Sequence, residues 1–170
     1  MCIMKILHTA DWHMDAAFSS FSDDRRSVLR REQRKLPGRI AEICRQEGCD
    51  LVLLAGDIFD GPATADSINA LRTALEEMAG PVFIAPGNHD FCGADSPWLN
   101  ETWPENVHIF TQPTVESVAL PQLGCRVYGA GFTAMDCPAL LDNFCADTDK
   151  PAIGILHGDP TQIASPNCPI

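Results

Sequence analysis

The sequence lacks any long apolar run, and no stretch approaches the roughly 20 residues that a helix needs to cross a membrane. Its first residues also lack the basic segment followed by an apolar segment that marks a secretory signal. We therefore expect a cytoplasmic protein without membrane contact. With 170 residues, 45% of them hydrophobic, the chain is long enough to form one domain with a buried core.

Cysteine pairs of the C-x-x-C kind are also missing, and a domain of this size does not need disulfides for stability. We expect mostly reduced thiols. Basic residues are few, since 12 Lys and Arg stand against 23 Asp and Glu. The net charge of −11 argues against a surface that binds nucleic acid over its whole area. Seven of the basic residues fall within 25–39, either on a solvated helix face or in a local basic patch.

The first half of the chain predicts strands that alternate with helices. The expected elements are a strand at 3–9, a helix at 27–47, a strand at 51–55, a helix at 64–79 and a strand at 81–85. Pro37 is expected to kink or split the first helix, because proline removes a helical hydrogen bond. This alternation implies parallel strands that are joined by right-handed crossovers.

The second half predicts a different arrangement after a loop at 86–105 that is rich in Gly, Pro, Asn and Asp. The expected elements are strands at 107–110, 114–120 and 126–132, a short helix near 137–145 and a strand at 152–156. Strands that follow one another directly favour antiparallel pairing. We therefore expect an α/β domain with a second, antiparallel part.

Four of the apolar runs end in side chains that commonly bind metal ions. These side chains are, in chain order, Asp11 and His13, then Asp57, then Asn88, His89 and Asp90, and finally His157. A parallel sheet brings the C-terminal ends of its strands to one edge, where open α/β sheets bind ligands. Residues that are far apart in the sequence are therefore expected to meet at one site.

The types of these side chains indicate the chemistry. A set of carboxylates, imidazoles and an amide suits Mn, Fe or Zn, whereas Ca and Mg prefer oxygen ligands alone. One carboxylate can bridge two cations. Two cations roughly 3.5–4 Å apart activate a water molecule and clamp the oxygens of a phosphate. The pattern thus predicts a two-metal hydrolase of phosphate esters.

These motifs resemble those of the calcineurin-like metallophosphoesterases. LHTADWH, GDIFD and PGNHD look most like the DNA-repair exonuclease branch of the SbcD type, whereas protein phosphatases tend to carry GDxVDRG and GNHE. The resemblance implies the layered metallophosphoesterase fold, with mixed β-sheets flanked by helices. The family's later G-H-x-H motif is absent. We therefore expect residues 1–170 to be the N-terminal portion of the domain, truncated before that motif.

The resemblance also implies a set of metal ligands. One ion would be held by Asp11, His13 and Asp57. The other would be held by Asp57, Asn88 and His157, so that Asp57 is the bridge. The resemblance favours Mn²⁺ for both positions.

Further roles follow from the same resemblance. His89 would be the general acid, and Asp90 would fix the tautomer of its ring. Asp60 is expected to steady the turn of GDIFD more than to bind metal. Asp159 lies near His157 and is either a supporting carboxylate or a solvated loop residue.

The function implied is a DNA-repair exonuclease that cleaves phosphodiesters with a hydroxide activated by two metal ions. The resemblance also implies a structural-maintenance-type ATPase partner and a homodimer. Two alternatives remain open: a metallophosphoesterase that acts on a small phosphodiester or monoester, and a catalytically inert domain of this fold that binds a partner.

Several other residues carry weaker signals. The aromatic residues of the 86–105 loop, Phe91, Trp98 and Trp103, either stack on bases or pack against one another. His8 lies within an apolar run and is expected to be buried. His108 alternates with apolar residues and is expected to face solvent.

Overall fold

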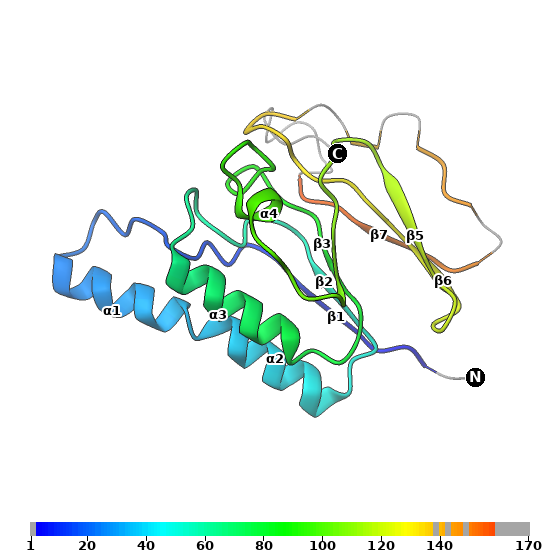
Figure 1. Cartoon of the computed structure of the whole chain (residues 1–170), viewed down its shortest axis with the longest axis horizontal. Helices are drawn as coiled ribbons and strands as arrows, with labels where there is room; N and C mark the ends of the chain where they lie inside the picture. The colour runs from blue at the N-terminus through cyan, green and yellow to red at the C-terminus, as the bar shows by residue number, and fades with distance from the viewer. Residues whose placement is uncertain (1–2, 138–139, 142–143, 148–149, 159–170) are drawn as a thin grey trace.

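Three layers make up the structure, a computed structural model that describes residues 3–137, 140–141, 144–147 and 150–158. Helices form one outer layer, a parallel sheet lies in the middle, and a second sheet forms the other outer layer (Figure 1). The parallel sheet contains, in spatial order, β1 (Ile6–Thr9), β2 (Leu51–Leu54), β3 (Val82–Ile84) and β4 (Val107–Ile109). This arrangement confirms the layered α/β fold.

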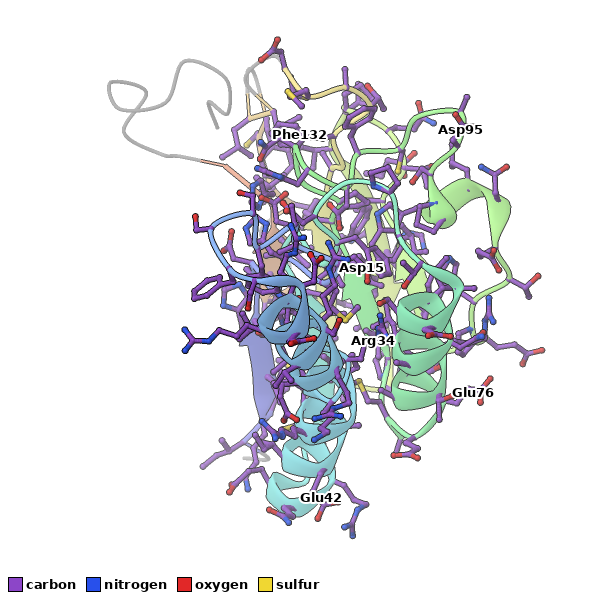
Figure 2. The ribbon with its side chains drawn as sticks, turned by 90° about the vertical axis from the view of Figure 1, so that its left-hand side faces the viewer. Asp15, Arg34, Glu42, Glu76, Asp95 and Phe132 are labelled. Carbon is purple, nitrogen blue, oxygen red and sulfur yellow. The ribbon has the colours of Figure 1, made fainter. Side chains whose placement is uncertain are left out.

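The helix expected at 27–47 is split into α1 (Asp23–Gln33) and α2 (Leu36–Glu47). Pro37 stands in the first turn of α2, where a backbone N–H has no helical partner in any case. The next helix, α3 (Ala65–Glu76), follows Thr64, whose hydroxyl caps the first turn. Figure 2 shows α2 and α3 lying side by side over the sheet, with Glu42 and Glu76 toward the end of the molecule opposite Asp95 and Phe132.

Alternation along β2 explains the order of the layers. Leu51 and Leu53 face one way and pack in the core between the two sheets. Val52 and Leu54 face the other way and pack in the core beneath α2 and α3. Because side chains alternate along a strand, a strand that is apolar at every position must be covered on both faces.

The second sheet contains β5 (Glu116–Leu120), β6 (Cys125–Gly129) and β7 (Ala152–Ile155) in that order. β5 pairs with β6 in the antiparallel sense, whereas β6 and β7 are parallel. The sheet is therefore mixed, and it delivers the end of β7 to the same edge of the molecule as the ends of β1, β2 and β3.

Two expectations for the second half need correction. β4 joins the parallel sheet beside β3, because the connection from Ile84 to Val107 is long enough for a crossover. That connection includes a short helix, α4 (Pro97–Asn100). The described residues of 137–145 are not helical, and the other residues of that stretch lie outside the described part of the chain. Among the described residues, no helix has the length and apolar character to cross a membrane.

The two strand histidines occupy the reverse of their expected environments. His8 is exposed because β1 is an edge strand of the parallel sheet. His108 packs against Phe110 and Phe83, with ring centroids 4.7 and 5.5 Å apart, on the face between the sheets. Burial there lowers the pKa of His108. The exposure of these two histidines depends on the position of each strand in its sheet. The alternation of apolar and polar residues along a strand does not reveal that position.

Candidate metal centre

The loops that follow β1 and β2 run side by side and carry three of the expected ligands. The N–H of Asp11 donates to the Gly56 carbonyl at 3.0 Å, and the N–H of His13 donates to the Asp57 carbonyl at 2.9 Å. These bonds extend the parallel β1–β2 pairing beyond the ends of the strands. The side chains of Asp11 and His13 are therefore held beside Asp57.

These three residues have left-handed backbone conformations. The φ angles are 56° at Asp11, 46° at His13 and 53° at Asp57. Non-glycine residues rarely adopt such angles, each at a cost of order 1–3 kcal/mol, and they gather at functional sites. Their concentration in two adjacent loops supports a functional role for this edge of the sheet.

The buried carboxylate of Asp90 shapes the loop that carries Asp57. It accepts backbone hydrogen bonds at 2.7–3.3 Å from Gly87, Ile58, Asp57 and Phe59. Burial raises the pKa of the Asp90 carboxyl to about 6, although the backbone donors, Gly87 foremost, counteract part of this rise. Asp90 therefore stabilises the loop that carries Asp57 through hydrogen bonds to its backbone.

Replacement of Asp90 by Asn is expected to lower the free energy of unfolding by about 2–4 kcal/mol, because an NH₂ group would replace one oxygen that faces N–H donors. Urea unfolding of the metal-free protein measures the change. Asp66→Asn serves as the control, since Asp66 is exposed in the first turn of α3 and pairs with Arg34 at the surface. Equal losses in the two variants would contradict the structural role of Asp90.

Two glycines leave room for the site. A Cβ atom at Gly56, where φ is 81°, would lie 2.5 Å from Nδ1 of His157. A Cβ atom at Gly87 would lie 2.2 Å from Oδ1 of Asp57. The glycines of GDIFD and GNHD are therefore required by the close approach of the backbone to these side chains.

Asp57 lies at the centre of the cluster and is almost fully buried. Its Oδ2 is 3.5 Å from Nε2 of His157 and 3.8 Å from Nε2 of His13. The carboxylate of Asp11 lies 3.9 Å from the same nitrogen of His13. Among the described residues, two groups have ligand atoms within 4.8 Å of one another, His13–Asp57–His89 and Asp11–Asp57–His157. Asp57 belongs to both groups.

His157 reaches the cluster from the second sheet, just after β7. Its Nδ1 lies 3.0 Å from the carbonyl of Ala55, a partner that can only accept, so Nδ1 carries the proton of a neutral ring. The lone pair of Nε2 then faces Oδ1 of Asn88 at 3.1 Å. An imidazole nitrogen and an amide oxygen that converge in this way can both bind one cation. The residues present therefore fit a metal ion at this position.

Asp60 lies between two imidazole rings. Its Oδ1 is 2.8 Å from Nδ1 of His89 and 3.2 Å from Nδ1 of His13. A carboxylate in this position holds the proton on Nδ1 of each ring and directs each Nε2 outward. For His13, that nitrogen points toward Asp11 and Asp57, as a metal ligand requires.

The structure thus brings all five expected ligands to one edge, but the expectation that Asp90 fixes the tautomer of His89 is wrong. Asp60 contacts the ring of His89, whereas Asp90 binds backbone N–H groups. The sequence signal for Asp60 was its position three residues after Asp57, within the same loop. Asp159 lies outside the described residues.

Similarity to known proteins places this fold in a family. The chain belongs to the calcineurin-like phosphoesterase family, whose sequence profile matches residues 4–163. It is 30% identical, over 98% of its length, to an uncharacterized metallophosphoesterase, YhaO, of Bacillus subtilis. It is 30% identical over 85% of its length to a subunit of the nuclease SbcCD of the same organism, and 27% identical over 69% to the corresponding protein of Staphylococcus epidermidis. The chain spans 44%, 37% and 31% of these relatives, respectively.

Proposed function

We propose that this chain carries the metal centre of a nuclease that hydrolyses phosphodiester bonds in DNA, with two Mn²⁺ ions as cofactors. The observation that carries the proposal is the buried Asp57 carboxylate, which is shared by two clusters of ligand atoms. The nuclease names of two relatives support DNA as the substrate.

Each side chain would have a distinct task. Asp11 and His13 would hold one ion together with Asp57, and Asn88 and His157 would complete the other position. Bound cations of this kind polarise phosphate oxygens and lower the pKa of water toward about 7. The chain itself supplies the fixed positions of these ligands through the backbone bonds of the adjoining loops.

His89 would serve as the proton donor. Its side chain is 45% exposed, so a substrate can reach the ring, and its Nδ1 is held by Asp60. A water molecule that has given one proton to solvent would attack phosphorus as hydroxide while the P–O bond to the leaving alcohol breaks. The imidazolium form of His89, with its Nδ1–H on Asp60, would pass its Nε2 proton to the leaving oxygen. Asp60 would position His89 and would not touch the substrate.

The test is hydrolysis of bis-p-nitrophenyl phosphate and of linear DNA in the presence of Mn²⁺ and after its removal by EDTA. Metal-dependent cleavage of both, with DNA binding that weakens as salt rises, supports the proposal. Cleavage of the small diester alone would favour a small-molecule phosphoesterase, which the net charge of −11 also favours. Binding of metal without any hydrolysis would favour an inert partner-binding domain.

The cellular setting belongs to the same proposal. By family resemblance, the protein would act in the cytoplasm as a homodimer with an ATPase of the structural-maintenance type. Two relatives are named as a subunit of the nuclease SbcCD, and such a name describes one part of a larger assembly. Co-purification of the ATPase with this protein, and the mass of the complex in solution, test this part.

A further inference from the structure

A cavity of about 250 Å³ is lined in part by His89. One wall is formed by Gly61 and Pro62, which follow the GDIFD motif. The other wall is formed by Phe91 and the segment 93–97. The ring of His89 thus borders both the metal centre and this cavity.

The wall at 91–97 is fastened by hydrogen bonds from the residues that follow it. The indole N–H of Trp98 donates to the Asp90 carbonyl at 2.7 Å, and the amide of Asn100 donates to the Ala94 carbonyl at 2.7 Å. The Trp98 ring is buried, with its centroid 5.2 Å from that of Trp103. Trp98 and Trp103 are therefore used for packing, which leaves Phe91 as the loop aromatic at the cavity.

Phe91 is half-buried, and apolar residues pack against it. It packs against the apolar cluster around Phe132, and the backbone N–H of Cys92 donates to the Phe132 carbonyl at 2.8 Å. The ring also lies over Gly93, where a Cβ atom would approach it to 2.8 Å. An aromatic ring held in this way is a preformed surface for stacking.

The remaining lining shows which group would fit. Pro62, Ala94 and Pro97 are apolar, and none of the described residues that line the cavity is a Lys or Arg that could bind a second phosphate. The carboxylate of Asp90 is occupied by backbone donors, whereas Asp95 is exposed and repels anions. Drug-sized ligands occupy cavities of about 300–1,000 Å³. This smaller cavity therefore suits one uncharged, flat ring system.

We infer that the cavity is the subsite for the leaving group and that it takes an aromatic ring, such as a single nucleobase, stacked on Phe91. The inference rests on the proposed function, in which His89 gives its proton to the leaving oxygen. The group attached to that oxygen must lie next to His89, and the cavity is the adjoining space. Phe91 is then a specificity-determining residue.

A kinetic test compares dithymidine monophosphate with two analogues that lack the base on the leaving or on the retained sugar. Loss of the leaving-side base is expected to lower kcat/KM about tenfold, within the range found for stacking of one base. Loss of the retained base should have little effect. Phe91→Leu keeps an apolar side chain against the Phe132 cluster. In this variant the decrease in kcat/KM should be the same whichever of the two bases is missing. Equal losses in the unchanged protein would overturn the inference.

A binding test does not depend on catalysis. Saturation-transfer NMR with thymidine and the metal-free protein should show contact with the base, which Phe91→Leu removes and Phe91→Tyr keeps. Leu99→Ala is the matched control, because Leu99 is exposed on the same segment and does not line the cavity. Absence of binding, or binding that Phe91→Leu leaves unchanged, would reject the subsite. An inactive protein that still binds thymidine through Phe91 would reject only the proposed reaction.

Discussion

Asp57→Asn is expected to weaken metal binding at both positions and to lower phosphodiester hydrolysis by about 10³-fold, the upper range for loss of one electrostatic contact at a reacting centre. The asparagine side chain can still accept the hydrogen bond that the N–H of His89 donates to Oδ1 at 3.0 Å. It loses the negative charge and places an NH₂ group near the imidazoles of His13 and His157. Isothermal titration with Mn²⁺ and hydrolysis of bis-p-nitrophenyl phosphate measure the two effects.

The matched control is Asp66→Asn, which makes the same chemical change at an exposed position on α3. It should leave both metal binding and hydrolysis unchanged. If Asp57→Asn binds one equivalent of Mn²⁺ with unchanged affinity, the shared role of this carboxylate is wrong. A single surviving position would mean that Asp57 serves only one ion.

His89→Gln is expected to lower kcat by about 10²–10⁴ for DNA, the usual contribution of a positioned general acid. The alkoxide that leaves from DNA needs a proton, whereas p-nitrophenolate is weakly basic and leaves without one. Hydrolysis of bis-p-nitrophenyl phosphate should therefore fall much less. The Mn²⁺ stoichiometry should stay the same, and His8→Gln, an exposed substitution on β1, should change neither rate.

The alternative for His89 is a ligand role, because its ring also belongs to one of the two ligand clusters. In that case His89→Gln would lower metal affinity and would slow both substrates equally. Asp60→Asn gives a further comparison, since loss of a group that orients a histidine typically costs about 10–100-fold. It is expected to affect His13 and His89 together, because Asp60 contacts both rings.

The order of the elements and the layered fold were predictable because buried strands and amphipathic helices leave local patterns. The apolar run at 51–55 predicted a strand, and the structure has one at Leu51–Leu54. Pro37 predicted a break between α1 and α2, and the break lies there. These signals depend on single residues or on their immediate neighbours.

Pairing and contact partners were not predictable in the same way. The strand at Val107–Ile109 has a pattern that fits either sheet, and only the long crossover from β3 placed it in the parallel one. Asp60 and Asp90 each follow a ligand motif, yet one faces two imidazoles and the other faces backbone N–H groups. The difference is set by how the two loops pack against each other.

By itself, the sequence determined which side chains follow the ends of the strands and therefore that oxygen and nitrogen ligands would gather at one edge. Only the tertiary structure decided that Asp60 contacts two histidines, that Asp90 binds backbone N–H groups, and that a cavity adjoins His89. The physical reason is that side-chain type is local information, whereas distances between loops arise from sheet packing. Oδ2 of Asp57 and Nε2 of His157 lie 3.5 Å apart because the strands that precede them, in two separate sheets, end side by side.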